Sequence, residues 1–147
     1  MTAGRNVVRF TVEFGDCDPA GIVFYPNFFR WMDAASRHYL VAMGIPPWHH
    51  VADAPGLIGT PLVDVHATFR HPASYGDEIT VETAVLEWRR TSFVLSHIIR
   101  RAELVLVEGR EVRVFACADS EDPKKIRAMQ PPESIRRLIE GRLPGAR

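Results

Sequence analysis

The sequence predicts an α+β fold in which a curved antiparallel sheet of about five strands wraps around one long central helix. Three observations indicate this class. A single segment of helical periodicity, residues 26–43, interrupts a chain that otherwise alternates between apolar and polar residues. One strand-like segment precedes the helix and four follow it, without βαβ repetition. The later segments are joined by short turns, so they should pair antiparallel.

The first predicted strand covers residues 7–13. Val8, Phe10 and Val12 fall on one side and polar residues on the other, which is typical of a strand with one buried face. Residues 15–21 then contain two aspartates, one proline and two glycines. This composition predicts a tight loop between the strand and the helix.

The predicted helix has a wide apolar stripe. Gly44, followed by two prolines, ends it. At about 1.5 Å per residue it is roughly 27 Å long, enough to cross a small sheet. The stripe consists of Phe28, Phe29, Trp31, Met32, Ala35 and Tyr39.

Residues 45–61 contain four prolines and two glycines, which predicts a long connection. Such a connection in a compact domain is often functional. The four later strands are expected at residues 63–69, 79–88, 92–101 and 104–118, with Gly109 marking a bulge or, less favoured, a turn. A basic tail, residues 123–147, includes a short predicted helix at 132–143. We therefore expect one domain over residues 1–147, with its core at about 7–119.

The bulk composition excludes several classes of function. Lys plus Arg and Asp plus Glu both number 18, so no global field attracts nucleic acid or an anionic membrane. Two cysteines without CxxC spacing suit a reducing compartment, and no metal-ligand motif is present. The N-terminus lacks a signal-peptide core, and no apolar run approaches about 18 residues. We expect a cytoplasmic protein with neither nucleic-acid nor membrane partners.

Asp18 is the main catalytic candidate. It lies in the tight loop just ahead of the helix, whose first backbone N–H groups lack internal partners and carry partial positive charge. Pro26 suits the first helical position because it has no N–H group. A thioester carbonyl directed at this helix end would be polarised, and Asp18 would act as nucleophile or general base. The alternative is that Asp18 only caps a turn, as Asp16 would.

One long motif carries a family resemblance. Residues 15–37, GDCDPAGIVFYPNFFRWMDAASR, resemble the active-site loop and helix of 4-hydroxybenzoyl-CoA thioesterases of the hotdog superfamily. The similarity continues in GIPPW (44–48), GTPLV (59–63), ASYGD (73–77), EWRRTSF (87–93) and EVRVFA (111–116). It covers most of residues 8–118. A shorter core of the motif also occurs in relatives that act on aliphatic acyl-CoA or acyl-carrier-protein thioesters.

The resemblance implies a hotdog fold and a role for each matching residue. Asp18 matches the catalytic aspartate, and Tyr25 the residue whose backbone N–H polarises the carbonyl. The substrate-binding positions are Asp33 near the ring hydroxyl, Trp48 in the acyl pocket, Thr60 close to the substrate, and Arg89, Arg90, Thr91 and Ser92 at the nucleotide end of CoA. Thr91 replaces a lysine of the family, which should weaken one phosphate contact without abolishing binding.

The resemblance further implies hydrolysis of 4-hydroxybenzoyl-CoA, or a close aryl-CoA, to the free acid and CoA, within a homodimer that assembles into a homotetramer and serves aromatic degradation. No cofactor is expected, since CoA is part of the substrate. Aliphatic thioesters or a non-catalytic module that binds CoA esters are the alternatives. Asp33 could instead pair with Arg37 at i, i+4, and the two arginines of the turn could simply be solvated.

Overall fold

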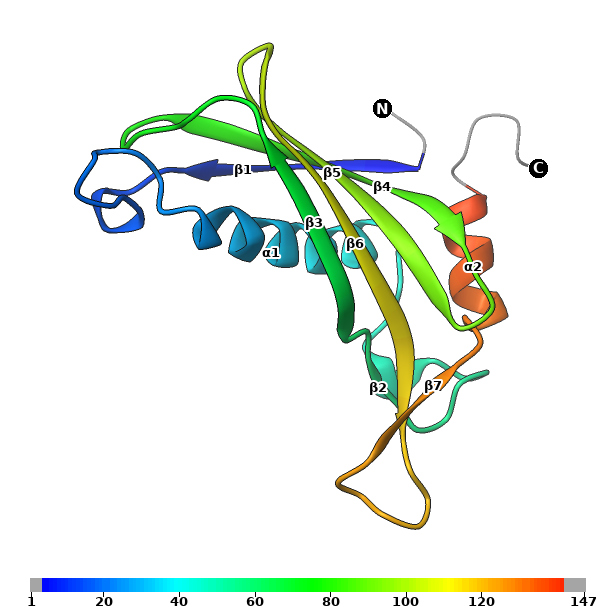
Figure 1. The fold of residues 1–147 in the computed structure, drawn as a ribbon. Helices are drawn as coiled ribbons and strands as arrows, with labels where there is room; N and C mark the ends of the chain where they lie inside the picture. The colour runs from blue at the N-terminus through cyan, green and yellow to red at the C-terminus, as the bar shows by residue number, and fades with distance from the viewer. Residues whose placement is uncertain (1–3, 142–147) are drawn as a thin grey trace.

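Residues 4–141, the part that the computed structural model describes, form one sheet and two α-helices (Figure 1). The sheet runs β1–β4–β5–β6–β2, and β3 and β7 also pair with β6. The strands are β1 (Arg5–Thr11), β2 (Leu57–Gly59), β3 (Leu62–Phe69), β4 (Glu78–Trp88), β5 (Ser92–Arg101), β6 (Leu104–Ala118) and β7 (Ile126–Met129). The helices are α1 (Pro26–Ala42), α2 (Glu133–Glu140) and the short 3₁₀ turns η1 (Phe14–Asp16) and η2 (Trp48–His50).

Every strand pair in this part of the chain is antiparallel, as predicted. The expected number of about five strands was too low, since seven strands are present among residues 4–141. The two additional strands, β2 and β7, have only 3 and 4 residues and pair with the end of β6. Segments this short are too brief to establish a visible alternation.

Helix α1 crosses the sheet and is enclosed by its curvature (Figure 1). Phe28, Trp31, Met32, Ala35 and Tyr39 are all buried, which confirms the predicted apolar stripe. The helix ends where expected: the N–H of Met43 donates to the carbonyl of Tyr39, and Gly44 follows with a φ of 87°. Burying such a stripe is what holds a helix of this length against a sheet.

Gly109 does not mark a bulge. Strand β6 stays in register around it, with Gly109 opposite His97 of β5 and Ala67 of β3. A Cβ atom at this position would lie 2.5 Å from the Cε of Met32. Glycine at this position leaves room for the end of the buried Met32 side chain of α1, and the bulge prediction was wrong.

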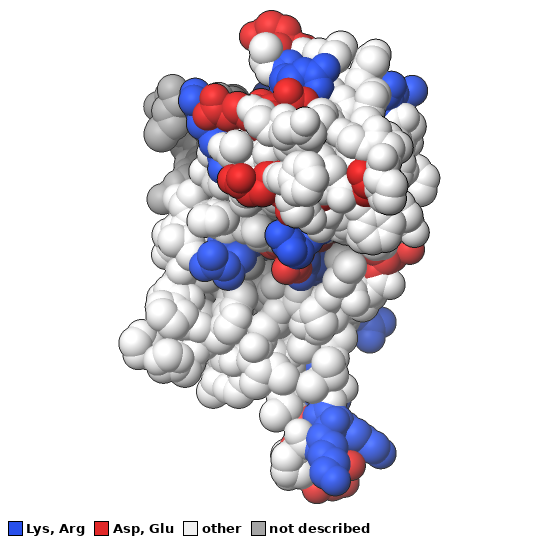
Figure 2. All heavy atoms as spheres, turned by 90° about the vertical axis from the view of Figure 1, so that its left-hand side faces the viewer, with Lys and Arg blue, Asp and Glu red and all other residues white. Residues whose placement is uncertain are grey.

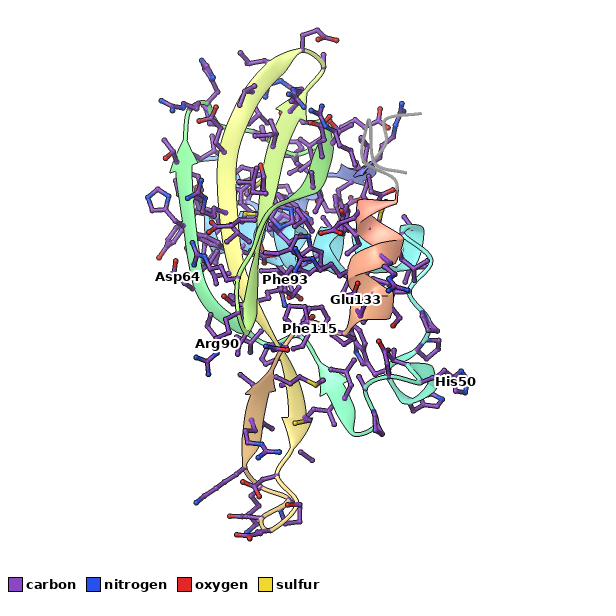
Figure 3. The ribbon with its side chains drawn as sticks, turned by 90° about the vertical axis from the view of Figure 1, so that its right-hand side faces the viewer. His50, Asp64, Arg90, Phe93, Phe115 and Glu133 are labelled. Atoms are coloured by element: carbon purple, nitrogen blue, oxygen red, sulfur yellow. The ribbon has the colours of Figure 1, made fainter. Side chains whose placement is uncertain are left out.

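The chain beyond residue 119 also contributes to the core. Ile135 and Ile139 of α2 are fully buried against Phe93 and Phe115, whose rings stack with centroids 4.9 Å apart (Figure 3). The core is thus larger than the predicted 7–119. Helix α2 lies within the predicted helix at 132–143, whose last two residues fall outside the described part. No helix in the described chain is long and apolar enough to cross a membrane.

Candidate active site

The loop that carries Asp18 is a small hairpin folded against the start of α1. The N–H of Asp18 donates to the carbonyl of Ile22 over 2.9 Å, and the N–H of Gly21 donates to the carbonyl of Asp18 over 2.9 Å. Next to them, the N–H of Phe24 donates to the carbonyl of Asp16 over 2.9 Å. Gly21 has a φ of 79°, which a residue with a side chain adopts at a cost. The hairpin fixes Asp18 relative to the residues that lead into α1.

The Asp18 carboxylate has both a structural and an available oxygen. Its Oδ1 accepts from the N–H of Ala20 over 2.9 Å, which is the turn-capping contact of the structural alternative. Within residues 4–141 the carboxylate has no second hydrogen bond and no ion pair. The side chain is half-buried. One oxygen therefore orients the group while the other can act on a ligand.

Asp16, two residues earlier, is occupied in a different way. Its Oδ2 accepts from the N–H of Glu13 over 2.8 Å, and its Oδ1 lies 3.8 Å from Arg30. The thiol of Cys17 is directed at the carbonyl of Glu13, 3.7 Å away. The side chains of Asp16 and Cys17 thus stabilise the shape of the loop. Asp18 is the carboxylate of the loop that keeps an oxygen without a hydrogen bond or an ion pair in the described chain.

The helix start supplies one available donor. The N–H groups of Asn27 and Phe28 donate to the carbonyls of Phe24 and Tyr25, so the turn itself uses them. Pro26, at the first helical position, has no N–H group. The N–H of Tyr25, by contrast, has no acceptor in the described chain. The structure therefore reduces the predicted helix-end donors to a single group, which directly follows the hairpin that carries Asp18.

A second feature of the site is a cavity of about 450 Å³ beside the middle of α1. Asp33, Trp48 and Thr60, three of the predicted substrate-binding residues, all line it. Its wall also includes Ser36, Arg37, Leu40, Ile58, Gly59, Pro61, Arg113, Ala116 and Ile126. Asp18 and Tyr25 are not part of this wall. One chain thus brings the pocket residues together but does not add the catalytic pair to them.

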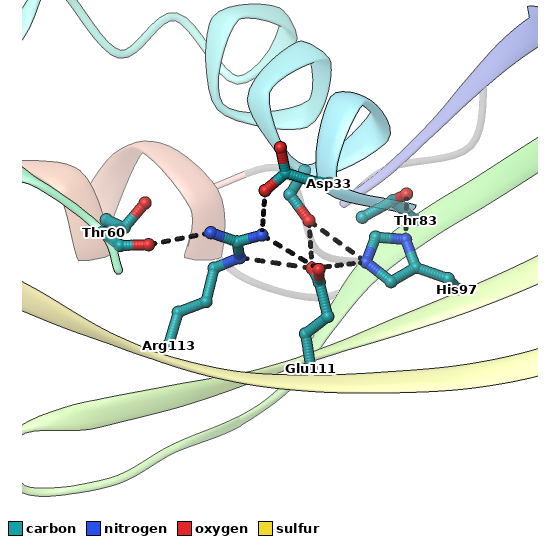
Figure 4. A network of polar contacts seen from close by, with 7 residues as sticks. Asp33, Thr60, Thr83, His97, Glu111 and Arg113 are labelled. Carbon is teal, nitrogen blue, oxygen red and sulfur yellow. Dashed lines mark hydrogen bonds and ion pairs between the residues drawn. The ribbon is translucent and has the colours of Figure 1, made fainter. Parts of the chain in front are cut away.

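Arg113 of β6, which the sequence did not single out, links two walls of this cavity (Figure 4). Its Nη2 donates to Oδ1 of Asp33 over 2.6 Å, and its Nη1 donates to the carbonyl of Thr60 over 2.8 Å. The alternative that pairs Asp33 with Arg37 is wrong, because the ion pair of Asp33 is with Arg113. The partners are 80 residues apart, out of reach of a local pattern.

Arg113 is itself held by a buried network. Glu111 accepts from its Nε over 3.2 Å and from its Nη2 over 2.9 Å. Glu111 also accepts from the hydroxyl of Ser36 and lies 2.8 Å from Nε2 of His97, whose Nδ1 lies 2.8 Å from the Thr83 hydroxyl. Burial acts to raise the pKa of Glu111, but hydrogen bonds from His97 and Arg113 outweigh it and lower the pKa to about 2.

A signal for this network was present in the sequence. Glu111 and Arg113 alternate with Val112 and share a strand face with Phe115, so the predicted strand places two charged residues on its buried side. Buried charges are rare unless they are paired. Counting Glu111 and Arg113 as members of the alternating buried face would have identified them as a buried ion pair.

The predicted CoA-binding residues lie at the turn between β4 and β5. The N–H of Arg89 donates to the carbonyl of Ser92, and its guanidinium pairs with Glu87 at 3.2 Å on the surface. Arg90 is exposed and Thr91 is half-buried. This turn and the Asp18 loop lie at opposite sides of the molecule (Figure 1). The two predicted ends of the substrate site are therefore not brought together within one chain.

A long helix inside a curved antiparallel sheet, entered through a carboxylate-bearing hairpin, defines the hotdog class of thioester hydrolases. The family model of the thioesterase-like superfamily matches residues 12–139. The chain is 46% identical over 126 residues to a 4-hydroxybenzoyl-CoA thioesterase of Pseudomonas sp. strain CBS-3, covering 82% of this chain and 87% of that protein. The chain belongs to the thioesterase-like superfamily.

Solved structures agree with this assignment. A variant of 4-hydroxybenzoyl CoA thioesterase complexed with 4-hydroxybenzoyl CoA superposes with a TM-score of 0.85 at 42% identity, over 93% of this chain and 99% of that chain. A gentisyl-coenzyme A thioesterase superposes with a TM-score of 0.74 at 34% identity, over 91% and 98%. The predicted hotdog fold and family are thereby confirmed.

Proposed function

We propose that this protein hydrolyses 4-hydroxybenzoyl-CoA, or a closely related aryl-CoA thioester, to the free acid and CoA. The observation that carries the proposal is the hairpin of residues 16–24, which leads directly to Tyr25. It presents a carboxylate oxygen of Asp18, and the adjoining N–H of Tyr25 has no acceptor in the described residues. The names of similar proteins support the aryl-CoA class, since one acts on 4-hydroxybenzoyl-CoA and another on gentisyl-coenzyme A.

In the proposed reaction, the N–H of Tyr25 donates a hydrogen bond to the thioester carbonyl and stabilises the negative charge that develops on its oxygen. Asp18 either attacks the carbonyl carbon or removes a proton from the attacking water. The carbon–sulfur bond then breaks, and the CoA thiolate takes up a proton. On the first route this leaves an acyl-aspartyl anhydride, which water hydrolyses to the free acid and the regenerated Asp18 carboxylate. On the second route the free acid forms directly. Thioesters are reactive enough that one carboxylate and one polarising donor suffice.

The cavity beside α1 suits an aromatic acyl group. Trp48 contributes a flat apolar wall, and Leu40 and Ile58 contribute aliphatic ones. Asp33 contributes a carboxylate, which accepts but does not donate when ionised. A ring hydroxyl would therefore find an acceptor in a pocket that these apolar side chains line together with polar ones.

We further propose that a second copy of the chain completes each site. The Asp18 loop and the arginines of the β4–β5 turn lie on opposite sides of one chain. Several large apolar residues near the loop are exposed, among them Phe24, Tyr25 and Phe69. Figure 2, which faces this side of the molecule, also shows a broad area without Lys, Arg, Asp or Glu below the level of the loop, between the centre and the protruding tip. Pairing of such surfaces would form a homodimer, and two dimers a homotetramer.

At the proposed interface, Arg89 and Arg90 from one copy would contact the phosphates of a CoA whose thioester reaches Asp18 of the other. Both guanidinium groups are on the surface and close to one another in sequence. Arginine binds phosphate through paired N–H donors. Thr91 adds a hydroxyl where the family has a lysine, so two cations remain for this contact.

The test is thiol release from a panel of aryl- and alkyl-CoA esters. Asp18→Asn should lower kcat by roughly 10²–10⁴-fold, the range for losing a positioned acid–base group. Asp16→Asn is the matched control, because an amide oxygen can still accept from the N–H of Glu13 and activity should be kept. Full activity of Asp18→Asn would refute the mechanism. A preference for alkyl esters would refute the aryl assignment alone.

Whether an acyl-aspartyl intermediate forms is a separate question. A single turnover with acyl-labelled substrate, quenched in acid, traps label on the protein if Asp18 acts as nucleophile. Label that appears only in the free acid indicates that Asp18 activates water instead.

A further inference from the structure

We propose that Arg113 is a positioning residue that fixes the carboxylate of Asp33 and the carbonyl of Thr60 at the acyl cavity. By holding Asp33, it would set the selectivity for acyl groups that carry a hydrogen-bond donor on the ring. This inference rests on the proposed aryl-CoA hydrolase function and adds to it a residue outside the recognised motif.

The first step is the contrast between the two partners of the ion pair. The side chain of Asp33 is 71% exposed, whereas that of Arg113 is 8% exposed. An exposed aspartate on a helix ordinarily samples several rotamers, so its carboxylate has no fixed direction. Contact with an immobile guanidinium at 2.6 Å selects the rotamer in which Asp33 faces the cavity.

The second step is that the guanidinium cannot easily move. Its Nε and Nη2 both donate to Glu111, and its Nη1 donates to the carbonyl of Thr60. Glu111 is fixed in turn by Ser36 of α1 and His97 of β5. No buried side-chain nitrogen or oxygen of the described residues lacks a partner. The orientation of the Asp33 carboxylate is thus set by side chains of the sheet and not by residues of its own helix.

The third step concerns the ligand chemistry. Oδ1 of Asp33 is occupied by Arg113, and within residues 4–141 no hydrogen bond reaches its Oδ2. An ionised carboxylate oxygen accepts from a hydroxyl or amine on the ring but repels an ether or a second carboxylate. A fixed Asp33 would therefore favour hydroxylated rings over unsubstituted ones, and unsubstituted rings over methoxylated ones.

Arginine is suited to this task where lysine is not. Three acceptors, one each from α1, the β2–β3 connection and β6, are contacted in different directions by one planar group. An ammonium group keeps the charge but cannot reproduce the fork geometry. Arg113→Lys should accordingly retain much of the local charge balance while releasing Asp33.

The experiment compares kcat/KM for 4-hydroxybenzoyl-CoA and benzoyl-CoA. In Arg113→Lys, the preference for the hydroxylated substrate should fall at least about tenfold, the lower end for a hydrogen bond to a charged group, while benzoyl-CoA turnover changes little. In an Asp33→Asn background, the same change should leave the preference unaltered. Arg110→Lys, at an exposed position of the same strand, is the control and should keep the preference.

The outcomes separate the two proposals. Equal losses on both substrates in Arg113→Lys, or an unchanged preference, would overturn the role of Arg113 and leave the hydrolase function intact. A wild-type protein that cleaves no aryl-CoA would overturn both. If thermal melts show that Arg113→Lys does not fold, the double variant Arg113→Gln with Glu111→Gln, which removes both charges of the buried pair and leaves neither unpaired, is measured in its place with the same expected loss of preference.

Discussion

Lowering the pH should destabilise the protein through one carboxylate in particular, Glu111. Its side chain is 2% exposed and lies among Ser36, His97 and Arg113. Burial alone would raise the pKa of Glu111, yet the hydrogen bonds from His97 and Arg113 lower it from an ordinary 4.5 to about 2. Protonation would remove the charge that these donors stabilise.

The sign and size follow from the pKa values of the folded and unfolded chains. Because the pKa of Glu111 is depressed in the folded protein, its stabilisation is complete above pH 4.5 and is lost as the pH falls toward 2. The difference corresponds to about 3 kcal/mol in the free energy of unfolding. About 2 kcal/mol of this should be lost by pH 3, where the unfolded chain is already protonated and the folded chain is not.

Urea unfolding between pH 7 and pH 3 measures this loss against Glu111→Gln, which cannot titrate at this position. We expect the variant to be less stable at pH 7 by about 3–5 kcal/mol, since it breaks a buried ion pair. The gap to wild type should then narrow by about 2 kcal/mol at pH 3. Carbon NMR of the Glu111 carboxyl gives its midpoint directly. A midpoint near 4.5, or a gap independent of pH, would refute the reasoning.

Three further changes test other parts of the structure. Gly109→Ala should cost about 1–3 kcal/mol of unfolding free energy in a urea titration, because its Cβ would displace the buried end of Met32, and an unchanged midpoint would contradict this. Asp53→Ala should cost about 1 kcal/mol by the same measurement, since Asp53 accepts from both the N–H and the hydroxyl of Ser134 at the start of α2; Asp53→Asn should lose less. Arg90→Ala should raise KM for the CoA ester far more than it lowers kcat in steady-state assays, and the reverse pattern would exclude a binding role.

The fold was predictable from the sequence wherever a long segment had one period. Helix α1 shows this best, because five large apolar residues recur on one face and Gly44 ends the pattern. The local pattern gave a wrong prediction for Gly109, which was expected to mark a bulge. This glycine instead leaves room for the side chain of Met32, which lies on another element. Strands β2 and β7 were missed because pairing with a long neighbour, rather than their own sequence, defines them.

The site divides in the same way. Asp18 and Tyr25 lie within one local motif: the position of Asp18 ahead of the helix made it a candidate, and the family resemblance of that motif implied the role of Tyr25. The partner of Asp33 was not accessible in this way, because the local alternative was Arg37 one turn away while the actual partner is Arg113 on a distant strand. A contact between a helix and a distant strand depends on how the two elements pack, and this packing is known only once the fold is known.

The distribution of site residues permits a direct test of whether two chains share one substrate. The test mixes two variants. One carries Asp18→Asn, and the other carries both Arg89→Ala and Arg90→Ala. Each variant should have low activity when it assembles only with itself. If the catalytic loop of one chain works with the β4–β5 turn of its partner, a mixed dimer has one site with every defect and one site with none.

Random assembly of equal amounts then makes half of all dimers mixed, so about a quarter of wild-type activity should return at low substrate concentration in a two-fold symmetric dimer. If one chain supplies both elements of a site, every site in the mixed dimer keeps a defect, and mixing restores nothing. Because the Asp18 loop and the β4–β5 turn lie at opposite sides of a chain, we expect the recovery. Activity that stays at the level of the separate variants would show that one chain binds and cleaves the thioester by itself.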